Sequence, residues 1–179
     1  MLVMNTGLSE ADYASIGRVV ANFSLLEHEI LLACYSLIEC EVGNAEDNID
    51  ALYMRYEPIV SGAFKKRSEQ FVKLIQPHCT ERFVKKLTKI LSHTQRFRDH
   101  FAHGVWMAGQ DGKIECGFFS RKGMAEGYPE DRTIMTRSDL DSLASLVAST
   151  LMDVRRLERL ITSAPFGPTE RIDFASGER

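Results

Sequence analysis

The 179-residue chain has no long apolar segment, and its cysteines follow no recognisable spacing. The longest apolar run, Ile30 to Tyr35, is far too short to cross a bilayer. The four cysteines form no CxxC pair and join no histidine pair in a zinc pattern, so free thiols in reducing surroundings are the simplest account. Residues 1–10 have no basic start followed by an apolar stretch, so we expect no secretion signal. These absences predict a cytoplasmic protein with no membrane partner and no cofactor.

An excess of positive charge is absent as well. The net charge is −3, which argues against nucleic-acid binding through bulk charge. The charge is unevenly distributed, however, because ten basic residues stand against three acidic ones between Lys65 and Asp99, giving +7 there and −10 elsewhere. Such a basic segment attracts a phosphate-bearing ligand or an acidic protein, although a solvated helix face explains many charge clusters.

The length suits one domain with its own core, which we assign to residues 1–163. Residues 164–179 contain two prolines and two glycines and are predicted to be a disordered tail. Apolar residues at helical spacing predict a first helix up to about residue 39, opened by a capping box of Ser9 and Asp12. Glu27 falls inside the apolar arc of this helix, so it needs a cationic or hydrogen-bonding partner unless a change of register leaves it at the solvent boundary.

The remaining elements are also predicted to be mainly helical. Helices are expected over 48–56, ending before Pro58, from about Val60 to Ile75, and over 81–103 with Thr80 as its N-cap. Residues 105–108 and 113–120 predict a β-hairpin on an Asp-Gly turn, followed by a polar loop and a short strand at 134–135. Ser138 and Asp141 predict the capping box of a closing helix. The fold class is therefore mainly α, a bundle of four to five helices with a small β-hairpin.

Most of the candidate chemistry lies at the end of the 81–103 helix. Its last turns read Arg96-Phe97-Arg98-Asp99-His100-Phe101-Ala102-His103-Gly104. On a helical wheel, one face within an arc of about 80° carries Lys89, His93, Arg96, His100 and His103. Arg98 lies about 140° from His103, so either the last turn is distorted or the two side chains come together from two subunits. A simpler interpretation is that Gly104 ends the helix in the left-handed conformation and the histidines lie at the negative end of its dipole.

A metal site is an alternative interpretation of the same histidines. His93, His100 and His103 lie on one helix face, but no carboxylate or cysteine joins them there. The neighbouring arginines also oppose a dication. We therefore expect no metal ligands in this set.

Two stretches resemble the HEPN superfamily of nucleotide-binding domains. Arg98-Asp99-x-x-x-His103 is similar to its motif of an arginine followed by four to six residues and a histidine, although Asp99 replaces the more frequent asparagine. Phe23-x-x-Leu26-Glu27-x-x-Ile30 resembles the first helix of many members. The resemblance covers roughly residues 10–104 and implies a helical bundle. In the catalytic branch it implies a homodimeric, metal-independent endoribonuclease with a composite Arg/His site, often a toxin or defence effector.

The resemblance gives each candidate residue a role. His103 takes the proton from a ribose 2′-hydroxyl, and Arg98 stabilises the charge that grows on the phosphoryl oxygens. Asp99 orients either group, Arg96 and His100 support the site, and Glu27 anchors Arg98 from the first helix. The expected partners are RNA or a nucleotide, a second copy of the chain and an antitoxin protein. The alternative is a non-catalytic, nucleotide- or RNA-binding or purely structural dimer.

Overall fold

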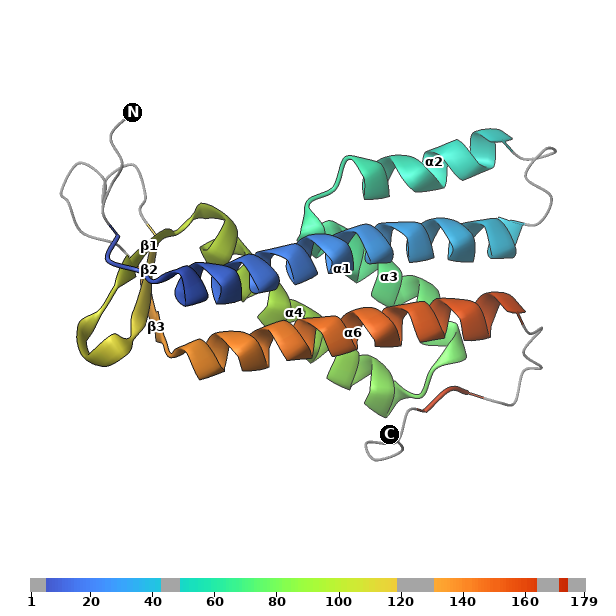
Figure 1. Ribbon diagram of the computed structural model, residues 1–179. Helices are drawn as coiled ribbons and strands as arrows, with labels where there is room; N and C mark the ends of the chain where they lie inside the picture. The colour runs from blue at the N-terminus through green and yellow to red at the C-terminus, as the bar shows by residue number, and fades with distance from the viewer. Residues whose placement is uncertain (1–5, 43–48, 119–130, 164–170, 174–179) are drawn as a thin grey trace. The chain divides into compact units, whose positions relative to one another are not determined.

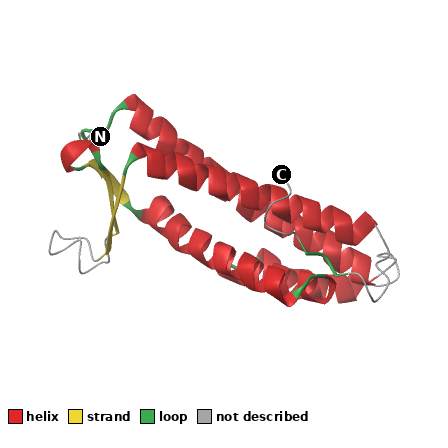
Figure 2. Cartoon of the chain, turned by 90° about the horizontal axis from the view of Figure 1, so that it is seen from below, coloured by secondary structure: helices red, strands yellow, loops and turns green. Residues whose placement is uncertain are grey.

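The computed structural model describes residues 6–42, 49–118, 131–163 and 171–173. These residues form, in chain order, α1 (Glu10–Val42), α2 (Ile49–Val60), α3 (Phe64–Ile75), α4 (Glu81–His103), β1 (Val105–Ala108), β2 (Ile114–Phe118), β3 (Asp131–Met135) and α6 (Arg137–Ser163) (Figure 1). Helices dominate the chain and the strands form one small antiparallel sheet (Figure 2). The predicted mainly-α class is confirmed. The predicted loop over 121–131 lies almost wholly outside the described residues.

The chain divides into two compact units that share three helices. The first unit holds residues 1–24 and 96–148, and the second holds residues 25–95 and 149–179. Because the dividing points fall inside α1, α4 and α6, each of these helices contributes to both units. The end of α4, with its cluster of arginines and histidines, belongs to the first unit.

Helix starts in the first unit are fixed by reciprocal side-chain caps. The predicted box at α1 is confirmed, since the Ser9 amide donates to Asp12 Oδ2 at 2.9 Å and the Asp12 amide donates to Ser9 Oγ at 3.2 Å. The predicted box at α6 is wrong by two residues. The amide of Thr136 donates to Asp139 Oδ2 at 2.8 Å, and the Asp139 amide donates back to Thr136 Oγ1 at 3.2 Å. The helix starts at this earlier box because β3 ends immediately before it, at Met135.

The predicted hairpin and third strand are both present in the first unit. The sheet has the order β1-β2-β3, with both pairs antiparallel. The turn between β1 and β2 places Asp111 at φ 56° and Gly112 at φ 70°, the left-handed conformation that the Asp-Gly sequence favours. Trp106, Cys116 and Thr133 are direct partners across the three strands. We call these three residues the cross-strand row.

The second unit is a helical assembly with an apolar core. Its fully buried side chains include Leu26, Ile30, Leu37, Ile38, Ile59, Phe71, Ile75, Leu91 and Leu157. The sequence prediction of one helix from Val60 to Ile75 is wrong, because α2 runs through Pro58 to Val60 and α3 begins at Phe64. Pro58 lies in the last turn of α2, two residues before the helix ends. Its missing amide therefore removes little of the hydrogen bonding within the helix. The connection between α2 and α3 is tight at Gly62, because a Cβ at this position would lie only 2.7 Å from the Pro58 carbonyl oxygen.

The structure describes residues 171–173 of the predicted disordered tail, and Ile172 among them pairs with the segment before α4. The Ile172 amide donates to the His78 carbonyl oxygen at 2.8 Å, and the Thr80 amide donates to the Ile172 carbonyl oxygen at 3.0 Å. These bonds make a short parallel bridge between Cys79 and Ile172. The other residues of that predicted tail lie outside the described part of the chain.

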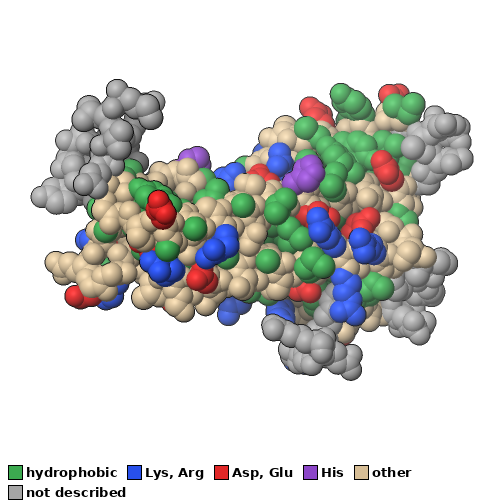
Figure 3. Space-filling model, viewed as in Figure 1, with side chains coloured by type: hydrophobic (Ala, Val, Ile, Leu, Met, Phe, Trp, Pro, Cys, Tyr) green, Lys and Arg blue, Asp and Glu red, His purple; other side chains and the backbone are tan. Residues whose placement is uncertain are grey.

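Apolar side chains are exposed along the outer face of α2 (Figure 3). Tyr53 and Met54 expose 74% and 73% of their surface, and Ile49 and Val60 are also exposed. We call these four residues the α2 outer face. None of the helices in the described ranges is long and apolar enough to cross a membrane.

Candidate functional site

The last turn of α4 is anchored by aromatic packing in the first unit. Phe101 is buried, and its ring lies edge-on to Phe23 of α1 at 5.8 Å and to Trp106 of β1 at 4.5 Å between ring centroids. Edge-to-face aromatic pairs of this kind add to the stabilisation from burial alone. The anchor fixes the direction in which the neighbouring polar residues of the turn project.

Gly104 allows α4 to end against the sheet. A Cβ at this position would collide with Cys116 Sγ and with the His100 carbonyl oxygen. Among the described residues the glycines with positive φ are Gly7 and Gly112, so the expected left-handed conformation of Gly104 is wrong. The glycine is needed for the close approach of strand β2, which sequence patterns do not reveal.

One cross-strand row of the sheet contacts His100. The Cys116 thiol donates to the His100 carbonyl oxygen at 3.3 Å, and Thr133 Oγ1 lies 3.4 Å from His100 Nδ1. Cys116 and Thr133 are register partners on β2 and β3, and Trp106 is the partner of Cys116 on β1. Burial raises the pKa of the Cys116 thiol to about 11, so this thiol is neutral at physiological pH. Thr133 was not predicted, because only the strand register brings it to the helix.

The predicted site residues lie on different sides of a regular helix end. His103 and Arg96 are exposed, while His100 and Arg98 are partly buried. Arg98 Nη1 pairs with Asp99 Oδ1 at 3.1 Å. The Gly104 amide donates to the His100 carbonyl oxygen at 2.7 Å, so the helical hydrogen bonding continues through His103. A distorted last turn is therefore excluded, and Arg98 stays about 140° around the axis from His103.

Glu27 lies in the second unit and has the cationic partner that its burial predicted. Its Oε1 accepts from Arg67 Nη1 at 3.0 Å, and the two side chains are 21% and 19% exposed. Arg67 also donates to the carbonyl oxygens of Ile59 and Val60, at 3.0 and 3.1 Å, which are among the last in α2. This ion pair joins Glu27 to α3, and the role of Glu27 as an anchor for Arg98 stays a prediction.

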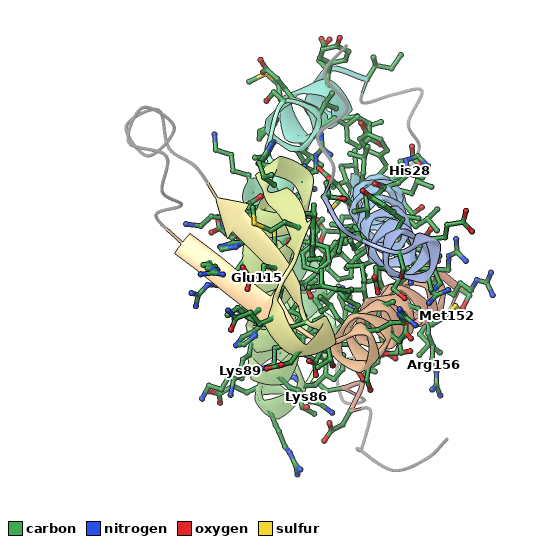
Figure 4. The ribbon with its side chains drawn as sticks, turned by 60° about the vertical axis from the view of Figure 1, so that its left-hand side comes forward. His28, Lys86, Lys89, Glu115, Met152 and Arg156 are labelled. Carbon is green, nitrogen blue, oxygen red and sulfur yellow. The ribbon has the colours of Figure 1, made fainter. Side chains whose placement is uncertain are left out.

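The basic segment forms an exposed surface in the second unit. Lys86 and Lys89 project outward from α4, and α3 carries further exposed lysines at positions 65, 66 and 73 (Figure 4). Lys85 pairs with Glu81 at 2.7 Å across one helical turn. Arg67 does not share this exposure, since it is held by Glu27 and α2. The charge that is open to a ligand is therefore mostly carried by lysines, which bind phosphate as point charges.

The described residues offer no group of three or more His, Cys, Asp or Glu side chains arranged to hold a metal ion. Comparison of the chain with protein-family models, curated proteins and solved structures gives no match. The resemblance to the HEPN superfamily therefore rests on the residues of Phe23–Ile30 and Arg96–Gly104 alone.

Proposed function

We propose that the protein is a metal-independent endoribonuclease that acts as a homodimer with a composite Arg/His site. The observation that carries the proposal is the end of α4, where an exposed His103 follows two arginines on a helix braced by Phe101, Gly104 and the sheet. A fixed backbone is what positions a general base and a phosphate-binding cation for reaction.

The chemistry needs one proton acceptor and one cation. His103 removes the proton from a ribose 2′-hydroxyl, whose oxygen then attacks the adjacent phosphorus atom. The bond from phosphorus to the 5′-oxygen breaks, the 5′-oxygen takes a proton from water, and a 2′,3′-cyclic phosphate is left. Arg98 stabilises the negative charge on the non-bridging oxygens during the step. Asp99 orients the Arg98 guanidinium, which it contacts at 3.1 Å.

A second subunit supplies the missing side of this site. Arg98 and His103 point about 140° apart on a helix that stays regular, so one copy does not place both on the same phosphate. Arg96 and His100 lie close to His103 in angle and support the base from the same copy. A two-fold axis beside this face brings Arg98 of the partner opposite the histidines.

The proposal extends to the cellular role. A ribonuclease of this type fits a cytoplasmic toxin or defence effector, kept inactive by an antitoxin protein that covers the end of α4. The exposed lysines of α3 and α4 suit the RNA backbone. They also suit an acidic surface on such an antitoxin.

The test is cleavage of a fluorescent single-stranded RNA by the purified protein in excess EDTA. We expect cleavage to a cyclic phosphate product, with His103→Ala and Arg98→Ala each lowering the rate at least 100-fold, the size typical of one general base or charge-stabilising donor. The matched control is His28→Ala, because His28 is an exposed histidine on α1 far along the sequence from the motif (Figure 4).

Two outcomes count against catalysis. Cleavage that survives in His103→Ala points to a contaminating nuclease. RNA binding without cleavage, weakened in the Arg98→Ala variant, supports the non-catalytic alternative instead.

A further inference from the structure

The imidazole ring and the backbone of His100 both contact the cross-strand row within the first unit. Thr133 Oγ1, on β3, lies 3.4 Å from His100 Nδ1. The Cys116 thiol, on β2, donates to the carbonyl oxygen of the same histidine at 3.3 Å. Thr133 and Cys116 are register partners, so one cross-strand pair holds this residue at two points. The two nitrogens of an imidazole lie on different sides of the ring, and with Nδ1 against Thr133 the nitrogen turned away from β3 is Nε2.

His100 is also the proton-carrying side chain nearest to His103 on their common face of α4. Side chains three residues apart on a helix have Cβ atoms about 5–6 Å apart, so two imidazoles at this spacing can flank one phosphate group. His93 lies seven residues before His100, about 10 Å farther along the axis, and Lys89 lies farther still. Arg96 stays protonated in proteins and gives up no proton. Within the described part of α4, this face therefore offers one partner for the base, which is His100.

The proposed cleavage benefits from an acid as well as a base. When the bond from phosphorus to the 5′-oxygen breaks, that oxygen leaves as an alkoxide unless it gains a proton in the same step. Water is a poor source of this proton, because its pKa is about 15.7. A positioned imidazolium supplies the proton near neutral pH, and one such group raises the rate by about 10²–10⁴-fold.

We propose that His100 is the general acid of this cleavage and that Thr133 is the residue that positions it. The inference rests on the proposed ribonuclease function, since it concerns the leaving group of the same reaction. His100 starts as the imidazolium, and the electron pair of the breaking bond stays on the 5′-oxygen, which takes the proton from His100 Nε2. His100 ends neutral, while His103 holds the proton of the 2′-hydroxyl, and exchange with water restores both. The Nδ1–H group donates to the Thr133 hydroxyl before and after the transfer, so the ring keeps its direction.

Sulfur in place of the 5′-oxygen separates the role of the acid from that of the base. A thiolate leaves without a proton, because a thiol is a far stronger acid than an alcohol. The substrates are the fluorescent RNA of the EDTA assay and the same RNA with sulfur as the bridging atom at the linkage that the natural chain cleaves. We expect His100→Ala to cleave the oxygen-linked RNA about 100-fold more slowly and the sulfur-linked RNA at the natural rate. His103→Ala, which lacks the base, should cleave both RNAs about 100-fold more slowly.

The positioning role of Thr133 is measured with the same two RNAs. Thr133→Val keeps the shape of the side chain but removes the hydroxyl group. We expect it to cleave the oxygen-linked RNA about fivefold to tenfold more slowly, the effect of one hydrogen bond, and the sulfur-linked RNA at the natural rate. Thr133→Ser retains the hydroxyl group and should retain the natural rate on both. The matched control is Thr162→Val, because Thr162 is exposed on α6 and its hydroxyl group donates to the Glu158 carbonyl oxygen of its own helix.

The contrary results distinguish this inference from the proposed function. An equal loss on both RNAs in His100→Ala, or no loss on either, overturns the assignment of His100 as the acid and leaves the ribonuclease proposal intact. A loss in Thr133→Val that is equal on both RNAs, or that Thr133→Ser shares, overturns the positioning role of the hydroxyl group. If the natural chain cleaves neither RNA in excess EDTA, the ribonuclease proposal fails and this inference fails with it.

Discussion

At the scale of single residues, Gly104 has no room for a side chain. A Cβ there collides with Cys116 Sγ and the His100 carbonyl oxygen. We expect Gly104→Ala to lower the free energy of unfolding by about 1–3 kcal/mol, as overpacking does. Urea unfolding followed by circular dichroism measures this change.

Gly17 provides the matched control for that substitution. It lies in α1 of the same unit, and a Cβ built there meets nothing within 4 Å. Gly17→Ala is therefore expected to raise the free energy of unfolding by about 0.5–1 kcal/mol, through helix propensity. Equal effects of the two substitutions would show that β2 does not approach Gly104 closely.

The thiols make a second prediction at this scale. Burial raises the pKa of Cys34 to about 12 and the pKa values of Cys79 and Cys116 to about 11, whereas Cys40 is exposed. Because the thiolate is the reactive form, we expect one of the four thiols to react quickly with DTNB in the folded protein at pH 8, and all four after denaturation. Cys40→Ser should abolish the fast phase; a fast phase that persists in this variant contradicts the buried placement of the other three.

At the scale of elements, Arg67 holds three helices of the second unit together. It donates to Glu27 of α1 and to two terminal carbonyl groups of α2 from its own place on α3. We expect Arg67→Met to destabilise the protein by about 3 kcal/mol, since the mostly buried Glu27 carboxylate loses its ion pair with Arg67. The measurement is again urea unfolding.

Arg55→Met is the control for the Arg67 variant. Arg55 pairs with Glu41, but both side chains are more than a third exposed. Such surface pairs contribute less than about 1 kcal/mol. A double variant with Glu27→Gln should recover part of the stability that Arg67→Met loses, because the side chain that has lost Arg67 is then neutral. If the double variant recovers no stability, the loss of the ion pair between Arg67 and Glu27 is not the cause of the destabilisation.

The cap of α1 predicts a dependence of stability on pH. Hydrogen bonds from the Ser9 side chain and from Arg137 lower the pKa of Asp12 to about 2, below its ordinary value of 3.8. Its contribution is therefore complete above about pH 4 and is lost as the pH falls toward 2. Asp12→Asn should be less stable by about 1 kcal/mol at pH 6, the size of a typical cap, with the gap closing in acid. A gap that is constant from pH 6 to pH 2.5 contradicts this assignment.

These elements also show what the sequence can and cannot predict. The hairpin and the Ser9 cap depend on local spacing, and both were predicted correctly. The α6 cap was misplaced because Thr136-x-x-Asp139 and Ser138-x-x-Asp141 both fit the same pattern, and only the end of β3 selects the first. The pairing of Glu27 with Arg67 joins residues forty positions apart, so the need for a cation was predictable but its identity was not.

At the scale of the whole molecule, the proposed site requires a dimer that uses the end of α4. The competing surface is the α2 outer face, where Tyr53 and Met54 are exposed. We expect light scattering to give a dimer mass, with His103→Asp converting it to a monomer and Tyr53→Glu leaving it a dimer. The reverse result would place the two-fold axis at α2 and separate dimerisation from the proposed site.

Mixing two inactive variants then shows whether each site draws on both subunits. Arg98→Ala lacks the phosphate-binding cation and His103→Ala lacks the base, so each homodimer is expected to be inactive. When equal amounts are unfolded and refolded together, half of the dimers are mixed, and each mixed dimer holds one intact site and one site that lacks both residues. The mixture should therefore recover about a quarter of the natural activity. If Arg98 and His103 act within one copy, every site lacks one of them and no activity returns, whatever the oligomeric state.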